Sequence, residues 1–540
     1  MTAVSVRRRS DRWDLALLIV TGSILGVTVL YPTIRLVVES ISDWQGPALL
    51  EGRRPASLWN TAVISLATVL TAGAVGTTLA LLIHRYSFPG RRALAALAYL
   101  PFTLPPLVGV LSFWYLIGRD GLLPRLLERV FGLDRAFLDG PAAILLIHTY
   151  SFYVFFYAMV GAALQSLDYS QIEAARTLGA SRARTLFKVT LPLLRSSLIG
   201  AALLTLMSSG ASFSAPLFFG SDYPMLSVQI YNERSQHRDA IALNLTLVLC
   251  VVSMLGLILF RSTSQAAGTA SKGVRVPIRS RARRMLGGFL AWSGTVVLLL
   301  PHMTILWFSF VDHRRWVTGI IPTTLTLDNY SSLLRDSRNL APLLNSLWMS
   351  ALAAIATLVV AAPSAYLVGR GRRGAGWVNW VVMLPWALPG TVVAMNLIVA
   401  FNDPWLPLYT TVWMLPLAYF IRNVPLLTRM VTAAVQAFDV SLIEAARTLG
   451  ANRAHWLRRI VLPLLAPALI AGTAMVFATC LGEFVASILL YLPANIPIAV
   501  QINMQWRGSG VGSAFAYSVF LMAMVAITFL VSRRFAARLL

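Results

Sequence analysis

Twelve long apolar segments constrain the fold of this chain more than any other feature of its sequence. A helix needs about 20 mostly apolar residues to cross the roughly 30 Å hydrocarbon core of a bilayer. Backbone polar groups find no water there, so they must pair internally, as they do in a helix. The sequence therefore predicts an all-α transmembrane protein. The twelve predicted helices cover residues 14–38, 58–84, 93–117, 141–164, 193–219, 240–260, 286–311, 344–369, 376–401, 409–431, 464–490 and 512–532.

The composition favours the same class of protein. Hydrophobic residues make up 57% of the chain and charged residues only 12%, too few to cover a soluble domain of this length. The net charge is +24, but the basic residues lie in short clusters between the apolar segments, which is typical of a membrane protein and does not indicate nucleic-acid binding. The two cysteines, Cys250 and Cys480, lie inside apolar segments, and we expect no disulfide.

The basic clusters also predict the orientation of the chain. If the N-terminus is cytoplasmic and the segments alternate in direction, the inside loops carry most of the Lys and Arg residues. The outside loops are then close to neutral. By the positive-inside rule, this distribution predicts twelve spans with both termini in the cytoplasm.

An internal repeat divides the chain. Residues 173–183 are EAARTLGASRA and residues 444–454 are EAARTLGANRA, so ten of eleven positions match at an offset of 271 (444 − 173). Each half holds six predicted spans, an even number, so the two halves are expected to form parallel six-helix repeats. We predict a first transmembrane half at residues 1–260, a polar and basic linker at 261–285, and a second transmembrane half at 286–540.

Both copies of the repeated segment lie in the longest predicted inside loop of their half. Each begins with Glu-Ala-Ala, a helix-forming run whose small alanine side chains let another surface approach closely. A glycine then interrupts the run, because it has no Cβ to obstruct a turn. The pattern predicts a helix–turn–helix on the cytoplasmic face. Its main residues are Glu173, Ala174, Ala175 and Gly179 in the first copy, and Glu444, Ala445, Ala446 and Gly450 in the second.

This pattern of Glu-Ala-Ala, three residues, Gly and a later Leu-Pro resembles the EAA loop of binding-protein-dependent ABC importer permeases. The resemblance covers nearly the whole chain and implies the type I importer permease fold with its two halves fused. In that family the loop is a coupling helix that docks in a cleft on the ATPase, so the eight residues above would be ATPase-coupling residues. A purely structural hairpin is the alternative. Two near-identical copies in diverged halves argue against it, because ordinary loops drift in sequence.

ATP chemistry is not expected in this chain. A P-loop needs a lysine directly after glycine, whereas Lys188 follows phenylalanine and Lys272 follows serine. The resemblance implies that ATP and Mg are bound by two copies of a cytoplasmic ABC ATPase. It also implies an extracytoplasmic solute-binding protein and a multi-pass location in a bacterial or archaeal cytoplasmic (inner) membrane. The chain would then be a transport subunit without a catalytic site or a cofactor of its own.

Glu483 is an ionisable residue within a predicted span, and Ser212 is its counterpart in the first half. A charge at this depth is costly and usually faces a cavity or a partner. Both residues are candidates for the lining of the translocation path. The alternative for Glu483 is a hydrogen-bonded structural carboxyl near a helix break. The six histidines show no metal-ligand spacing, so no metal site is predicted, and His148 and His302 stand out only by lying in or beside spans.

The substrate is indicated by resemblance alone. Single-chain permeases with two EAA loops resemble ferric-iron importers most, followed by thiamine, polyamine and 2-aminoethylphosphonate importers. The segments FSAPLFFG (213–220) and GEFVASILLY (482–491) are most similar to the iron group. An ion-coupled secondary transporter is the alternative from another class, since it can also be built from two six-helix halves. The paired EAA loops and the scarcity of charge within the spans argue against it.

Overall fold

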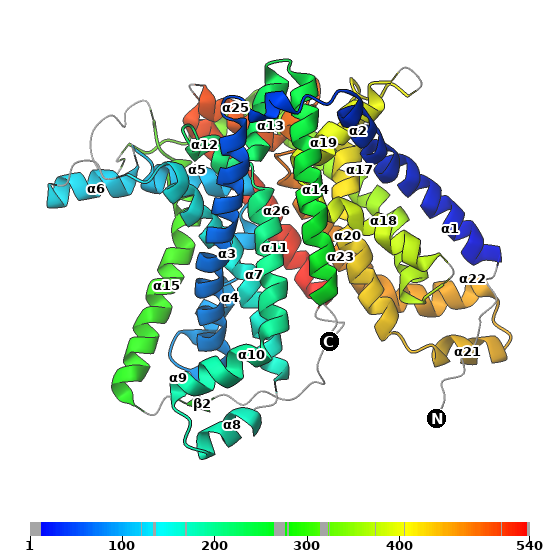
Figure 1. The fold of residues 1–540 in the computed structure, drawn as a ribbon, viewed down its shortest axis with the longest axis horizontal. Coiled ribbons are helices and arrows are strands. Elements are labelled where there is room, and N and C mark those ends of the chain that lie inside the picture. Colours follow the sequence, from blue (N-terminus) through cyan, green and yellow to red (C-terminus); the bar gives the residue numbers. More distant parts are fainter. Residues whose placement is uncertain are drawn as a thin grey trace. The chain divides into compact units, whose positions relative to one another are not determined.

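The computed structural model describes residues 12–119, 121–132, 137–167, 170–263, 276–277, 280–313, 322, 324–372, 374–403, 406–508 and 510–536. Within these ranges the chain is almost entirely helical (Figure 1). The two short strands β1 (Tyr86–Ser87) and β2 (Val276–Pro277) pair in parallel. Most of the predicted linker, residues 264–275 and 278–279, lies outside the described residues. The next helix begins at Arg281, inside the predicted linker.

The chain forms two compact units. The larger unit comprises residues 43–333 and 502–519, and the smaller unit comprises residues 1–42, 334–501 and 520–540. The larger unit holds η2 (Pro47–Leu50), α3 (Arg54–Arg85), α4 (Arg91–Leu97), η3 (Leu100–Thr103), α5 (Pro106–Ile117), α6 (Leu122–Phe131), α7 (Gly140–Ser166), α8 (Ser170–Thr177), α9 (Arg182–Thr185), η4 (Leu186–Thr190), α10 (Leu191–Leu193), α11 (Arg195–Gly210), α12 (Ser214–Phe219), α13 (Leu226–Ser235), α14 (Asp239–Thr263) and α15 (Arg281–Phe308).

The smaller unit holds α1 (Arg12–Leu25), η1 (Gly26–Leu30), α2 (Tyr31–Ser42), α17 (Ser337–Gly369), α18 (Ala375–Ala387), α19 (Gly390–Phe401), α20 (Met414–Ala437), α21 (Ser441–Thr448), α22 (Arg453–Trp456), η5 (Leu457–Val461), α23 (Leu462–Leu481) and α24 (Ser487–Leu490). Three helices lie across the boundaries between the units: α16 (Asp328–Arg335), α25 (Ile498–Arg507) and α26 (Val511–Ala536).

A bundle of α3, α7 and α11 forms the centre of the larger unit, where the three helices lie side by side (Figure 1). Small residues let α3 and α7 approach closely, as is common between membrane helices. A Cβ on Gly76 would lie only 2.3 Å from the carbonyl oxygen of Tyr153. The first helix of the second sequence half, α15, also belongs to this unit: it packs on α4 and α5 and contributes Ala291 and Leu298 to the buried core.

The smaller unit has the corresponding bundle of α17, α20 and α23. The N-terminal helices α1 and α2 pack on α17, α18 and α19 of this unit. Two ion pairs connect them to it: Asp14, which is 3% exposed, lies 3.2 Å from Arg372, and Arg35 lies 3.3 Å from Asp403. The first helical segment of each predicted sequence half therefore belongs to the compact unit formed mainly by the other half. For the first half this segment is α1 to α2, and for the second half it is α15.

Eight described helices are long and apolar enough to span a membrane, and four helix pairs bent by more than 40° raise the number to as many as twelve. Each of the twelve falls on one predicted segment. The predicted third span of each half, 93–117 or 376–401, is not a single straight helix, however. The axis turns by 107° between Thr103 and Pro106 and by 111° between Ala387 and Gly390. Prolines at these breaks remove helix hydrogen bonds and force the chain out of the α conformation.

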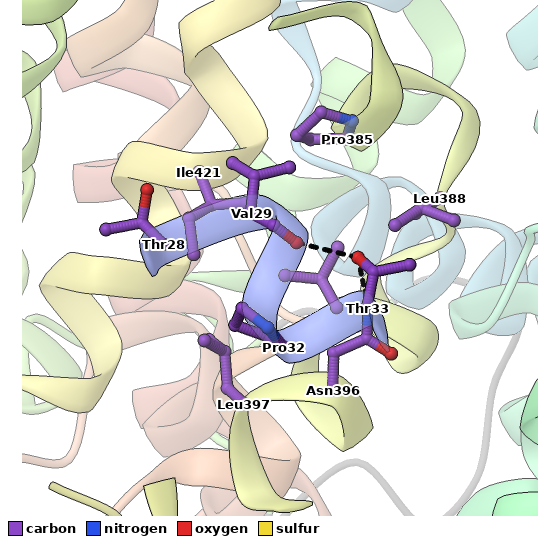
Figure 2. A pocket seen from close by; sticks show the side chains of 10 residues that line it. Thr28, Val29, Pro32, Thr33, Pro385, Leu388, Asn396, Leu397 and Ile421 are labelled. Carbon is purple, nitrogen blue, oxygen red and sulfur yellow. Dashed lines mark hydrogen bonds between the residues drawn. The ribbon is translucent and has the colours of Figure 1, made fainter. Parts of the chain in front are cut away.

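The break between α18 and α19 packs against η1, the π-helical turn that connects α1 to α2 (Figure 2). Pro385 lines a small cavity there together with Thr33 and Asn396. The Asn396 side chain donates a hydrogen bond to Thr33 Oγ1 (3.2 Å), which itself donates to the Val29 carbonyl (2.8 Å).

Candidate functional site

The first repeated segment folds as a short hairpin of α8 and α9, at the end of the larger unit opposite to α12 and α13 (Figure 1). The turn is a Schellman motif: the N–H of Ala180 donates to the Ala175 carbonyl (3.0 Å) and the N–H of Gly179 donates to the Arg176 carbonyl (3.0 Å). Gly179 has a φ of +82°, the left-handed region that glycine adopts without strain. This confirms the predicted helix–turn–helix.

The second repeated segment, α21 and α22 in the smaller unit, has the same hydrogen bonds. The N–H of Ala451 donates to the Ala446 carbonyl (2.9 Å), the N–H of Gly450 donates to the Arg447 carbonyl (3.0 Å), and Gly450 has a φ of +79°. Local sequence is therefore sufficient to determine this hairpin.

The one mismatch in the repeat preserves the hairpin. Ser181 Oγ accepts a hydrogen bond from the N–H of Arg184 (3.3 Å) at the start of α9. Its counterpart, Asn452, accepts one from the N–H of His455 (2.8 Å) at the start of α22. Serine and asparagine are both preferred at this position because the side-chain oxygen satisfies an unpaired helix N–H. The substitution keeps the second helix of each hairpin in place.

Each hairpin presents a mixed polar and apolar surface. Glu173 and Ala174 are exposed in the first copy, as are Glu444 and Ala445 in the second. In contrast, Ala446 is only 8% exposed and packs against its own unit.

Leu178 and Leu449, which the sequence analysis did not single out, are each 88% exposed. They occupy the same position in the two copies, directly before the turn glycine, and that coincidence was visible in the repeat. Because the same large apolar side chain is exposed at the same position of both hairpins, it is a candidate protein–protein contact.

The second candidate region is the helix break that follows α23. Glu483 lies in this break and connects it to α20. One of its carboxylate oxygens accepts a hydrogen bond from the N–H of Ala486 (3.0 Å). The other lies 2.9 Å from Nε of Arg422 in α20. The guanidinium in turn packs on the start of α19, where a Cβ on Gly390 would lie 2.4 Å from Nη1. This is the geometry of the structural alternative, a hydrogen-bonded carboxyl near a helix break. A role of Glu483 in the translocation path stays a prediction.

Arg422 was missed in the sequence analysis. An arginine in the middle of the predicted span 409–431 is as unusual as a glutamate, and it was the available signal for a partner of Glu483.

The corresponding break in the larger unit, after α11, holds a histidine and hydroxyl groups in place of the ion pair. Ser212 Oγ lies 2.8 Å from Nε2 of His148, and Nδ1 of the same ring lies 2.9 Å from Ser209 Oγ. His148 is 1% exposed. The halves therefore use the same position differently, with an ion pair at Glu483 and a histidine–hydroxyl network at Ser212.

The larger unit also carries a buried ion pair at the end opposite its hairpin. Arg54 lies 2.9 Å from Glu233 in α13, and Gln229 donates a further hydrogen bond to this carboxylate (2.7 Å). Burial alone would raise the pKa of Glu233. The hydrogen bonds from Arg54 and Gln229 and the charges of Arg54 and Arg238 outweigh burial and lower the pKa below its usual value. The ion pair fixes α13 to the start of α3.

Metal binding has no geometric support within the part of the chain that the structure describes. No group of three or more His, Cys, Asp or Glu side chains is arranged there to hold an ion.

Comparison with known proteins identifies the family. Residues 73–267 and 353–540 each match the family described as the binding-protein-dependent transport system inner membrane component, and together they cover more than half of the chain. The chain belongs to this family. The two matches confirm the predicted permease repeat and the all-α membrane fold.

Three relatives illustrate the range of permeases that this permease resembles. A protein of Sinorhizobium fredii named as the ABC transporter permease protein y4fN is 32% identical, with 83% of this chain and 81% of that protein covered. The ferric transport system permease protein FbpB of Actinobacillus pleuropneumoniae is 27% identical, with 94% and 77% covered. A Salmonella typhi protein named as the 2-aminoethylphosphonate transport system permease PhnV is 27% identical, but the match covers 45% of this chain and 92% of that protein.

Replacing both turn glycines of the permease, Gly179→Ala with Gly450→Ala, is expected to open the hairpins. No heavy atom lies within 4 Å of a Cβ at either site, so the cost is backbone strain, about 1 kcal/mol per site. We expect a severalfold loss of ATP-dependent transport in reconstituted vesicles. Gly376→Ala is the matched control, because its Cβ also enters open space but its φ is not positive. Equal transport in both variants would show that the turn geometry does not matter.

Proposed function

We propose that this chain is the permease subunit of an ATP-driven importer of ferric iron. The observation that carries the proposal is the pair of hairpins with identical backbone hydrogen bonding and the same exposed Glu, Ala and Leu side chains. The likeness to ferric permeases over 94% of the chain supports iron as the solute. The chain itself would bind no resident metal, since an extracytoplasmic binding protein would chelate and deliver the ion.

The two hairpins would each dock on one copy of a cytoplasmic ABC ATPase, which binds ATP and Mg. Glu173 and Glu444 would each form a buried, hydrogen-bonded ion pair with a cation of the docking cleft, and Leu178 and Leu449 would enter its apolar part. An apolar contact surrounded by polar contacts is the usual composition of a protein–protein interface. Both chain termini would then lie in the cytoplasm, as the distribution of basic residues predicts.

Movement of the ATPase would reach the membrane through the fifth span of each half. In the second half, α22 runs without a break through η5 into α23, so residues 454–481 form one continuous helix. Its far end is the break that holds Glu483. Displacing the hairpin would therefore tilt the helix and shift the Glu483–Arg422 pair. In the first half, the corresponding segment ends beside Ser212.

A second candidate solute is 2-aminoethylphosphonate, because the PhnV relatives match one half of the chain. The family match argues against the ion-coupled secondary transporter, the alternative from another class. Such a transporter requires no ATPase, and the paired hairpins would then have no docking partner.

The test is transport by the chain reconstituted with its co-purified ATPase and each candidate binding protein. We expect ATP-dependent uptake of radiolabelled ferric iron, stimulated by one iron-loaded binding protein. Stimulation by a protein loaded with 2-aminoethylphosphonate would replace iron as the solute and keep the importer mechanism. A chain that purifies without an ATPase and transports only under an ion gradient would overturn the importer.

A further inference from the structure

A basic groove lies beside the first hairpin, within the larger unit. Its volume is about 410 Å³. Its polar lining consists of Gln171 from α8, Lys188 from η4, and Arg195 and Ser196 from the start of α11. Leu193 contributes an apolar wall. The groove is therefore formed where the hairpin meets the fifth span of the first half.

Within the described residues, no carboxylate neutralises the positive charge of the groove. No acidic residue is among its lining residues. In the described part of the chain, no ion pair involves Lys188 or Arg195, and both side chains are exposed. Two cations held beside a cavity without counter-charges form a site suited to an anion.

A bend in the backbone opens this groove. The axis turns by 70° between the helical segment Arg182–Leu193 and α11, whereas the corresponding residues 454–481 of the second half form a single helix.

The lining also differs between the halves. At the repeat offset of 271, Leu442 stands for Gln171, Arg459 for Lys188, Ala466 for Arg195 and Pro467 for Ser196. The groove is thus not part of the hairpin geometry that the two halves share, and ATPase docking by itself does not explain it.

Exposed apolar side chains include Leu193, which lines the groove, and Phe187 and Ile199, which lie within four residues of lining residues in the sequence. Phe187 is 65% exposed, Leu193 is 42% exposed and Ile199 is 45% exposed. A free phosphate would use only the cations. A phospholipid would use both features, with its phosphate at the cations and its acyl chains along the exposed apolar residues.

We propose that this groove binds the headgroup phosphate of an anionic phospholipid, with Lys188 and Arg195 as its cationic contacts and Gln171 and Ser196 as hydrogen-bond partners. The groove lies at the end of a spanning helix, the level at which headgroups occur. Basic pockets at this level between membrane helices are suited to anionic lipids. A bound lipid would stabilise the contact between α8 and α11, and so the position of one hairpin but not of the other.

The test measures lipid retention by the full-length chain with its ATPase. The complex is released from nanodiscs of mixed phosphatidylglycerol and phosphatidylcholine, and bound lipids are counted by native mass spectrometry. We expect Lys188→Ala with Arg195→Ala to weaken phosphatidylglycerol binding roughly thirtyfold, since each cation near a membrane surface contributes about 1 kcal/mol. Arg458→Ala with Arg459→Ala is the matched control, which removes two cations from the corresponding segment of the other half and should retain the lipid.

Three other outcomes would overturn the proposal. Equal loss of phosphatidylglycerol in both double variants would mean that binding depends on net charge and not on the groove. Displacement of the lipid by millimolar inorganic phosphate would assign the groove to the free anion. Unchanged lipid retention with loss of the ATPase from the Lys188/Arg195 variant would assign it to the partner protein. Thermal unfolding of each variant, compared with the unsubstituted chain, separates these results from misfolding.

Discussion

ATP-dependent uptake is expected to fall at least a hundredfold when Glu173 and Glu444 are replaced together by alanine, while the chain remains folded. Both carboxylates are exposed, and neither has a side-chain partner within the described residues, so their removal costs the chain itself little. At an interface, the loss of one partner of a close charge pair costs about 2–5 kcal/mol, and here it would occur at both hairpins. The measurement is uptake into vesicles together with co-purification of the ATPase.

The single variants sharpen this experiment. If each hairpin docks on its own ATPase copy, Glu173→Ala and Glu444→Ala should each give a partial loss. Glu51→Ala, which removes a carboxylate that is 72% exposed in the segment between η2 and α3, is the control and should leave uptake unchanged. Intact uptake and intact co-purification in the double variant would mean that these glutamates do not couple the chain to an ATPase.

The free energy of unfolding should fall by about 3 kcal/mol in Glu483→Ala, because the substitution leaves Arg422 inside a span without its carboxylate. It also removes the hydrogen bond to the N–H of Ala486. Glu483→Gln should be less harmful, since the amide oxygen can still accept that bond. The measurement is chemical unfolding of the purified chain in detergent micelles.

A double variant distinguishes a structural role of Glu483 from a role in the translocation path. Glu483→Gln with Arg422→Met removes both charges, and we expect it to recover most of the lost stability. If uptake recovers as well, Glu483 is a structural anchor. If the stable double variant still fails to transport, the carboxylate acts in the translocation path. A Glu483→Ala variant as stable as the unsubstituted chain would show that the ion pair is not an anchor.

Local features of this chain could be predicted well because each depends on residues that are close in sequence. The length of an apolar segment determines whether it can span a bilayer, and the twelve predicted segments all coincide with candidate spans. The hairpins require only a helix-forming run, a glycine at positive φ and a capping side chain within eleven residues. The mismatch between Ser181 and Asn452 is harmless for the same local reason.

The breaks within the spans were harder to predict. Hydropathy averages over a window, so it cannot distinguish a straight helix of 26 residues (376–401) from two shorter ones that meet at 111°. Pro105, Pro106, Pro385 and Pro389 at these sites interrupt helix hydrogen bonding. The size of each bend depends on what packs against it, such as η1 against the break between α18 and α19.

The sequence by itself determined the all-α membrane fold, the duplication and the two hairpins, since these follow from apolar length, internal identity and short-range backbone hydrogen bonding. Only the tertiary structure decided which helices share a unit, because the partners of α1 and α15 are hundreds of residues distant or in the other half. It also decided the pairing of Glu483 with Arg422 and the opening of the basic groove. Each depends on side chains that meet only after separate helices have packed.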